Sequence, residues 1–371
     1  MNTKIPEKQR RVNHVKRLSD TARMPGRSYF LILITTVVLL FSFLISFFVA
    51  LAKDPSDTEY QGGSFNENHQ SGTQSGSQNI DKSSPSKGGN FPGSTVPKRS
   101  SYISSPSGSV DYISSQINSE NVILVDLSSY KSIAEKGADQ KIYPASMTKV
   151  MSLLVACERL KSLKTVLTVT KEIVDYSAEM DGSGIGLEVG DKLTVQDLLY
   201  LTAYQSDTIA VTMLARHVAG SETEFVNFMN DKARSLGLTK TRFANPTGLH
   251  DENNYTTCRE MAAIFAYALE NPLCKELLTS YEAYKIGNKY TIYSSWYSGR
   301  FKDNPRLQTV TVSGGKTGYI DESGFCLVSY AIGKSSGKKF IQVIVGQPKG
   351  SGLTETKSVT DIKYVYNNYA S

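Results

Sequence analysis

The chain has 371 residues, of which 40% are hydrophobic, and it carries a formal net charge of +6. Eight basic and two acidic residues within 1–28 account for the whole of that excess, so the rest of the chain is neutral. A nucleic-acid-binding protein needs a basic face on its folded part. The charge distribution therefore excludes that class and predicts no nucleic-acid partner, while the length allows one large domain or two small ones.

An uncharged apolar segment of 24 residues, Tyr29–Ala52, follows the basic tail. As a helix it would be about 36 Å long, enough to cross a bilayer. The positive-inside rule then predicts a basic cytoplasmic tail over 1–28 and a single-pass cell-membrane anchor over 29–52, with everything later outside the cytoplasm. The alternative is a cleaved signal peptide, since Ala50-Leu51-Ala52 resembles a cleavage site. The segment exceeds the usual signal core of about 7–15 residues, which favours the anchor.

Residues 53–109 are rich in Ser, Gly, Asn, Gln and Pro and contain few large apolar side chains. Such a composition cannot bury enough surface to offset the entropy of ordering, so we predict a flexible linker. The folded part is expected over 110–371. It is predicted to begin with a short amphipathic helix over 110–118, then a strand over 121–127, a turn over 128–130 and a partner strand over 132–135.

A helical apolar pattern then begins at Ser146. Further helices are predicted over 195–203, 208–218, 222–235 and 257–269, with a loop over 243–255. The pattern changes after residue 306, where we expect strands over 307–312, 324–332 and 340–345, a turn over 333–338 and a closing helix over 354–369. Strands at both ends of a helical block predict one α+β domain, in which an antiparallel sheet is covered by the first and last helices and a mostly helical subdomain lies to one side.

The sequence gives little indication of a metal site or of disulfide bonds. The four cysteines form no C-x-x-C pair and lie in apolar patterns, so we interpret them as buried small hydrophobic residues: Cys157, Cys258, Cys274 and Cys326. An extracytoplasmic location would permit disulfides, but the spacing does not decide whether they form. Two histidines fall in the folded part and no H-E-x-x-H occurs, so we predict neither a metal site nor a cofactor.

Ser146 and Lys149 form the first candidate catalytic pair. The pattern S-x-x-K occurs at six places, but only at Ser146 does it open a strongly apolar helical run. Residues three apart share a helix face, and a helix N-terminus offers N–H groups to a developing oxyanion. A lysine whose pKa is lowered can take the proton of a serine hydroxyl. The alternative is a serine cap beside a solvated lysine.

Two further motifs lie downstream. Lys316-Thr317-Gly318 stands between two strand patterns, and a small glycine at a strand edge allows a substrate backbone to pair there. Lys316 and Thr317 could bind a carboxylate. Lys316 could also lower the pKa of Lys149. The alternative is a plain glycine turn. Ser206-Asp207-Thr208 stands at the start of a predicted helix, where capping is the ordinary explanation.

The order of these motifs matches the set S-x-x-K, S-D-N and K-T-G. Over about 120–370 the chain resembles the D-alanyl-D-alanine carboxypeptidases among the low-molecular-mass penicillin-binding proteins. The resemblance extends to PASMTK around Ser146, to FANPTGLHDENNYTTCREMA at 243–262 and to GGKTGYIDESGFCLVSYA at 314–331. It implies a β-lactamase/transpeptidase-like fold and a peptidoglycan stem peptide ending in D-Ala-D-Ala as the substrate.

The resemblance also implies roles for individual residues. Ser146 would attack the carbonyl between the two D-alanines, Lys149 would be the general base, and Ser206 would relay the proton to the leaving amine. β-Lactams would acylate Ser146 as covalent inhibitors.

Substrate binding would involve the other residues of the motifs. Lys316, Thr317 and Gly318 would hold the terminal residue, and the backbone N–H groups of Ser146 and Tyr319 would bind the oxyanion. The family pattern usually has Asn where this chain has Thr208. Since a hydroxyl cannot replace both functions of an amide, we expect that acylation or substrate positioning is weakened, or that it uses a partner other than Thr208. Two alternatives stay open: a β-lactamase or DD-endopeptidase with the same chemistry, and a non-catalytic binder of wall peptide or β-lactam.

Overall fold

The computed structural model describes residues 111–113, 117–295, 307–346 and 355–370. The predicted tail, apolar segment and linker lie outside these ranges. Within them, no helix combines the length and the apolar character needed to span a bilayer.

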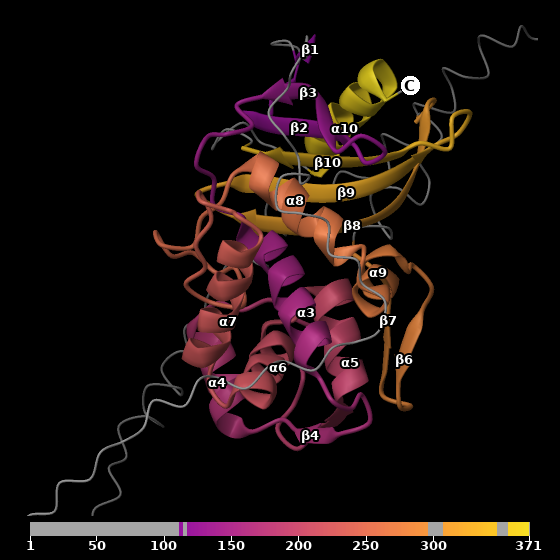
Figure 1. Cartoon of the computed structure of the whole chain (residues 1–371). Coiled ribbons are helices and arrows are strands. Elements are labelled where there is room, and N and C mark those ends of the chain that lie inside the picture. The colour runs from indigo at the N-terminus through magenta and orange to yellow at the C-terminus, as the bar shows by residue number, and fades with distance from the viewer. Residues whose placement is uncertain (1–110, 114–116, 296–306, 347–354, 371) are drawn as a thin grey trace, which may run out of the picture. The chain divides into compact units, whose positions relative to one another are not determined.

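A six-stranded sheet forms one layer of the domain, with strand order β1-β3-β2-β10-β9-β8 (Figure 1). Its strands are β1 (Asp111–Tyr112), β2 (Asn121–Asp126), β3 (Lys131–Lys136), β8 (Val310–Ile320), β9 (Gly324–Gly333) and β10 (Lys339–Val345). β1 pairs parallel to β3, and every other pair is antiparallel. Because β2 pairs with β10, the two ends of the folded part meet in the middle of the sheet, as the sequence predicted.

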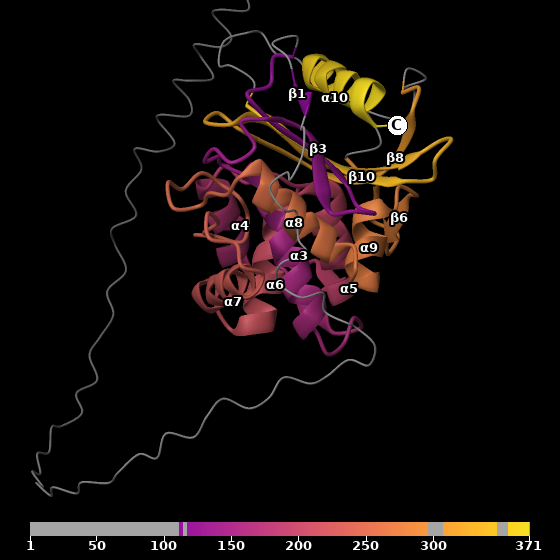
Figure 2. The ribbon, with the colours of Figure 1, turned by 45° about the horizontal axis from the view of Figure 1, so that its top comes forward.

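Helices cover both faces of this sheet. α10 (Glu355–Tyr369) lies on one face and α8 (Cys258–Ala268) on the other, as Figures 1 and 2 show. The alternation of side chains along a strand explains how both faces become apolar. In β2, Val122 and Leu124 belong to the cluster beneath α10, whereas Ile123 and Val125 belong to the larger cluster on the other side.

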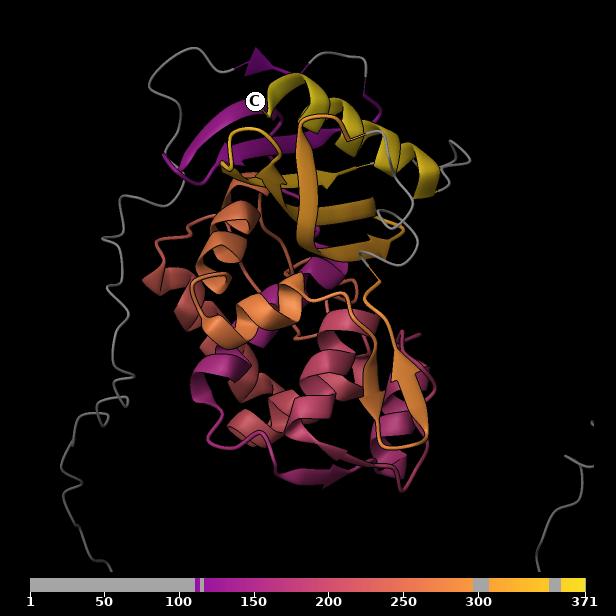
Figure 3. The ribbon, with the colours of Figure 1, turned by 90° about the vertical axis from the view of Figure 1, so that its right-hand side faces the viewer.

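The helical block lies beside the sheet layer (Figure 3). Its helices are α3 (Thr148–Arg159), α4 (Lys171–Glu179), α5 (Val195–Tyr200), α6 (Thr208–Ala219), α7 (Glu222–Ser235) and α9 (Pro272–Thr279). α3 is the central one: ten of its twelve residues are buried, and it packs against α6, α7, α8 and α9. The site therefore starts from the most constrained helix of the domain.

Some predicted elements were wrong or missing. The helix predicted over 110–118 was wrong, because Asp111–Tyr112 is strand β1 and the N–H of Ile113 donates to Glu135 O at 2.9 Å. A short helix is marginal alone, whereas the open edge of β3 satisfies these backbone groups. Periodicity also missed α4, α9 and two small two-stranded sheets. One pairs β4 (Val166–Thr168) with β5 (Lys192–Thr194), and the other is the hairpin of β6 (Tyr284–Ile286) and β7 (Tyr290–Ile292).

The strand predicted over 307–312 begins instead at Val310 and continues to Ile320, so the third motif lies inside β8 and not between strands. Glycines in this stretch suggested a turn. Their role is close packing: a Cβ on Gly315 would lie 2.8 Å from Val328 O of the neighbouring strand. All four cysteines are buried thiols, as expected from their apolar patterns.

Candidate active site

Ser146 lies in η1 (Ala145–Met147), a single 3-10 turn that leads into α3. The residue before it, Ala145, has φ +48°, a left-handed conformation that costs a non-glycine residue about 1–2 kcal/mol. The loop over 243–255 keeps this turn in place, since Gly248 packs so tightly that a Cβ there would lie 1.9 Å from Ala145 O. The N-cap of α3 is Met147, so the capping alternative for Ser146 was wrong.

Lys149 lies one turn along α3 and contacts the serine directly. Its Nζ donates to Ser146 Oγ at 3.1 Å and to Thr247 O at 2.5 Å, and the residue is 1% exposed. Burial lowers the pKa of the Lys149 ammonium from its ordinary 10.5 to about 7, against the opposing effect of the Asp207 carboxylate. A lysine in this state is neutral often enough near neutral pH to accept the serine proton.

Ser206 and Lys316 form a second contact, between the end of η2 and strand β8. Lys316 is fully buried in β8, and its Nζ donates to Ser206 Oγ at 3.0 Å and to Thr317 O at 3.1 Å. Ser206 ends the π-helical turn η2 (Leu201–Gln205) in a left-handed conformation, with φ +58°. Burial is the largest cause of the lowered pKa of Lys149. A contribution from Lys316 stays a prediction.

Asp207 is the cap of α6, and this confirms the ordinary explanation for that residue. It is 1% exposed, and its carboxylate accepts from Ala210 N at 2.9 Å and from Ile185 N at 3.0 Å. Burial raises the pKa of this carboxyl, while these backbone N–H groups and Lys149 act in the opposite direction. The capping bonds therefore tie the segment around Ile185 to the start of α6, directly beside Ser206.

Thr208 is buried rather than open to the cleft. Its backbone N donates to Ser183 O at 2.8 Å, and its side chain is 1% exposed. Among the described residues, no group hydrogen-bonds to its Oγ1. A substrate contact of Thr208 stays a prediction.

Strand β8 brings the third motif against the nucleophile. Gly318 packs on the turn so closely that a Cβ would lie 3.0 Å from Ser146 N and 2.6 Å from Cys326 Sγ. This approach places the start of residue 319 beside Ser146, where the two backbone N–H groups are expected to bind an oxyanion. β8 is also the last strand of the sheet, so one side of its backbone faces no other described strand. An extended peptide could pair there.

Sequence reasoning missed several residues that complete the site. Thr247 supplies the carbonyl that binds Lys149, and Asn245 Oδ1 shapes this loop by accepting from Gly248 N at 2.7 Å. Ser295 Oγ lies 3.3 Å from Thr317 Oγ1. The run Asn-Pro-Thr-Gly was a detectable signal for the first of these turns, whereas nothing in the sequence pointed to Ser295.

The geometry brings together a serine, a lysine with a lowered pKa, a second buried lysine and backbone donors at one strand edge. This set can form and break an acyl-serine bond. A model of the D-alanyl-D-alanine carboxypeptidases, Peptidase_S11, matches residues 108–349.

The chain belongs to this family. It is 32% identical over 243 residues to the D-alanyl-D-alanine carboxypeptidase DacF of Bacillus subtilis, covering 64% of this chain and 60% of that protein. It is 30% identical over 216 residues to a D-alanyl-D-alanine endopeptidase of Escherichia coli, covering 57% of this chain and 67% of that protein. The chain thus spans less than two thirds of the length of DacF.

The fold agrees with this family. A solved variant of the Streptomyces K15 DD-transpeptidase superposes with a TM-score of 0.59 and 24% identity, covering 68% of this chain and 98% of that one. The predicted α+β fold of the β-lactamase/transpeptidase type, with an antiparallel sheet and a mostly helical subdomain, is therefore confirmed.

Proposed function

We propose that this protein is a serine-type D-alanyl-D-alanine carboxypeptidase that removes the terminal D-alanine of peptidoglycan stem peptides. The observation that carries the proposal is the 3.1 Å contact between Ser146 Oγ and Lys149 Nζ, in a place where burial lowers the pKa of the lysine to about 7. A binding protein has no need for a nucleophile beside such a base.

In the first half of the reaction, neutral Lys149 takes the proton of Ser146 as its Oγ attacks the carbonyl between the two D-alanines. The N–H groups of Ser146 and Tyr319 stabilise the oxyanion. The C–N bond then breaks, and the leaving amine takes the proton held by Lys149, relayed through Ser206, so that Lys149 is neutral again. The Ser206 Oγ that relays it accepts a hydrogen bond from Lys316 Nζ at 3.0 Å.

In the second half, Lys149 takes a proton from water, which attacks the acyl carbonyl. The ester bond breaks, Ser146 recovers its proton, and the peptide leaves one D-alanine shorter. Lys316 and Thr317 would bind the terminal carboxylate, because an amine and a hydroxyl at a strand edge can both donate hydrogen bonds to an anionic group. β-Lactams would acylate the same serine.

The location of the enzyme is a part of the same proposal. The apolar segment over 29–52 would anchor the chain in the cell membrane, with residues 1–28 in the cytoplasm and the catalytic domain outside, close to its wall substrate. Extraction of membranes at alkaline pH tests the anchor: an integral protein stays with the lipid, whereas release would contradict an uncleaved span.

Fluorescent penicillin tests the function. We expect the full-length chain to form a covalent adduct that Ser146→Ala abolishes. Ser335→Ala is the matched control, since Ser335 also begins an S-x-x-K match but lies in an exposed turn. D-alanine release from a pentapeptide should follow the same pattern.

Other outcomes would change the assignment. A folded chain without an adduct would favour a non-catalytic binder. Rapid turnover of the penicillin would indicate a β-lactamase, and cleavage of cross-linked peptides in preference to pentapeptides would indicate an endopeptidase.

A further inference from the structure

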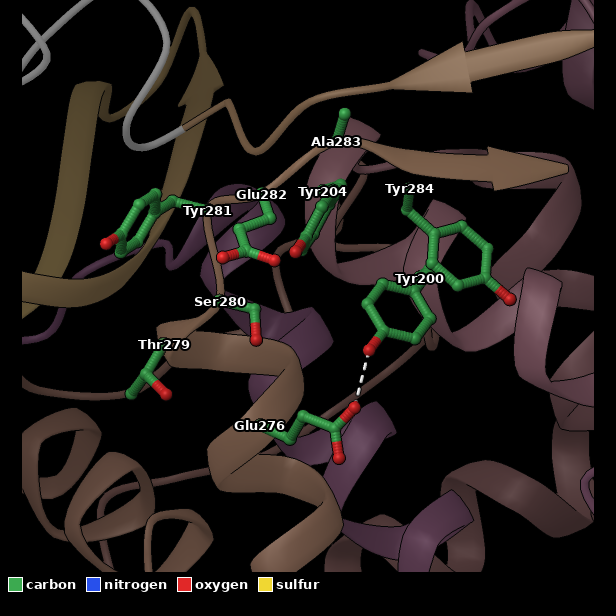
Figure 4. Close-up of a pocket in the computed structure, with 9 residues that line it drawn as sticks. All are labelled: Tyr200, Tyr204, Glu276, Thr279, Ser280, Tyr281, Glu282, Ala283 and Tyr284. Carbon is green, nitrogen blue, oxygen red and sulfur yellow. Dashed lines mark hydrogen bonds between the residues drawn. The ribbon is translucent and has the colours of Figure 1, made fainter.

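A pocket with a volume of about 400 Å³ lies between η2, α9 and the start of β6 (Figure 4). Four tyrosines and two glutamates dominate its lining: Tyr200, Tyr204, Tyr281, Tyr284, Glu276 and Glu282. Nothing in the proposed acyl chemistry uses these side chains, so the pocket needs a separate explanation.

Hydrogen bonds and stacking fix one wall of the pocket. The rings of Tyr200 and Tyr284 stack with centroids 3.8 Å apart and planes 9° from parallel. The Tyr200 hydroxyl donates to Glu276 at 2.6 Å, and that of Tyr284 donates to Asp197 at 3.0 Å. The wall is therefore held in place without a ligand.

The charged side chains that line the pocket are acidic. Among the nine described residues that line it, none is lysine, arginine or histidine. Both glutamates have exposed side chains, and Figure 4 shows the carboxylate of Glu282 beside the hydroxyl of Tyr204. Burial raises the pKa of the Tyr204 phenol to about 12, and both carboxylates add to this effect.

This lining matches a primary ammonium group. Such a group donates three hydrogen bonds and accepts none, and the pocket offers carboxylate and phenol oxygens as acceptors. Tyrosine rings also attract a cation through their π-systems. An anionic ligand would be repelled by the two carboxylates, and a purely apolar ligand would gain nothing from them.

The pocket lies on one particular side of the proposed reaction. From the C-terminal end of β8 towards its start, the strand passes Tyr319, the expected oxyanion donor, then Thr317, the proposed carboxylate-binding residue, and then Gly314. Gly314 packs against the pocket residue Thr279, whose Cγ2 would be 2.9 Å from a Cβ there. The pocket therefore lies beyond the expected carboxylate site, on the leaving-group side of the scissile bond.

Ser295 connects the pocket with the cleft. Its N–H donates to Tyr204 O at 3.0 Å, and its Oγ lies 3.3 Å from Thr317 Oγ1. Tyr204 also precedes Ser206 by two residues. Ser295 thus joins a residue that lines the pocket to Thr317, the proposed carboxylate-binding residue.

We propose that this pocket binds a primary ammonium group carried on the leaving-group side of the scissile bond. The inference rests on the proposed function for the direction of the substrate. The side chain of a terminal D-alanine lacks such a group, whereas a leaving group with an amino side chain carries one.

Binding is tested first, without catalysis. In full-length Ser146→Ala, saturation-transfer NMR should detect 1,5-diaminopentane but not the uncharged 1,5-pentanediol. Glu276→Gln/Glu282→Gln should weaken diamine binding about fivefold, since exposed ion pairs contribute modestly. Glu179→Gln/Glu224→Gln removes two exposed carboxylates from α4 and α7 and should change nothing. Equal loss in both double variants, or no binding of the diamine, would overturn the proposal.

Selectivity is tested second, with peptides ending in D-Ala-D-Lys and D-Ala-D-norleucine. We expect kcat/KM to favour the lysine peptide about fivefold in the unmodified protein and the ratio to approach one in Glu276→Gln/Glu282→Gln. A ratio near one in the unmodified protein would overturn the placement on the leaving-group side. If no peptide is cleaved, D-Ala-D-Ala included, the proposed function fails, and the diamine titration still decides the pocket.

Discussion

Two turns of this domain each present a serine, and they are stabilised differently. The turn around Ser146 leads into α3, and the turn around Ser206 leads into α6. Each contains one residue in the left-handed region, Ala145 in the first and Ser206 itself in the second. Both therefore store backbone strain that the surroundings must offset.

The first turn is fully satisfied by neighbouring groups. Lys149 binds Thr247 O, Thr148 Oγ1 accepts from Asn254 at 3.1 Å, and Ser152 Oγ donates to Pro246 O at 2.7 Å. One loop supplies all three partners. The nucleophile and its base are thus fixed by a single segment that follows them by about a hundred residues in the chain.

The second turn is held by groups from several elements: the buried Asp207 carboxylate, Lys316 Nζ on Ser206 Oγ, and Ser183 Oγ, which donates to Ser206 O at 2.9 Å. Asp207 binds two backbone N–H groups, while Thr208 and Thr212 on the same helix face leave their hydroxyls without a partner among the described residues. The difference teaches that a single loop holds the proposed base, whereas groups from several elements hold the proposed relay serine. Substitutions should affect chemistry in the first turn and stability in the second.

The largest effect is expected for Lys149→Met. Removal of the general base should lower the rate of acylation by penicillin about a thousandfold, since such bases contribute roughly 10²–10⁴. Stopped-flow labelling measures this rate. Lys161→Met, which removes an exposed lysine after α3, is the control and should leave it unchanged. A loss below tenfold would show that another group is the base.

The pH dependence gives the next effect. Only neutral Lys149 accepts a proton, so acylation should rise about tenfold per pH unit up to about 7 and then level off. The folded pKa lies below the ordinary 10.5, so between these values the unfolded chain binds more protons. The free energy of unfolding should therefore rise with pH in this window and fall as pH drops to about 7. Chemical denaturation of the unmodified protein and Lys149→Met isolates the effect, and a profile identical in both would contradict it.

Asp207→Ala should destabilise the second turn by about 3 kcal/mol. It removes a helix cap worth about 1 kcal/mol and leaves buried N–H groups unpaired, which adds about 1–3 kcal/mol. Urea unfolding measures the loss. Asp207→Asn keeps an acceptor for one of the two N–H groups and should recover part of it. Equal stability of the alanine variant would show that the carboxylate does not hold the turn.

The smallest effect is expected at Thr208. Thr208→Val keeps the shape and removes an unpartnered hydroxyl, so it should stabilise the fold by about 1 kcal/mol without slowing acylation. Thr208→Asn restores the usual family residue and should raise or preserve activity. If Thr208→Val slowed acylation, or Thr208→Asn lowered activity, Thr208 would be an adapted part of the site.

The motifs, and most of the helices and strands that carry them, could be predicted from the sequence, because they depend on the spacing of nearby residues. The strands β2, β9 and β10, the helices α6, α7 and α8, and the pair Ser146–Lys149 all follow from apolar spacing and three-residue separation. The contact between Lys316 and Ser206 could not be predicted, since it joins residues 110 apart in the chain. Extension of β8 through the glycines was missed for a similar reason: close packing against another strand, not local propensity, decided it.

The sequence by itself determined the class of chemistry, because it shows a serine, a lysine three residues later and two downstream motifs in a fixed order. Only the tertiary structure decided the protonation of Lys149, since burial among distant segments sets its pKa. It also decided the surroundings of Thr208 and the pocket of tyrosines and glutamates. The burial of Thr208 and the shape of the pocket depend on how residues distant in the chain pack together. That packing is set only when the sheet and the helical block come together.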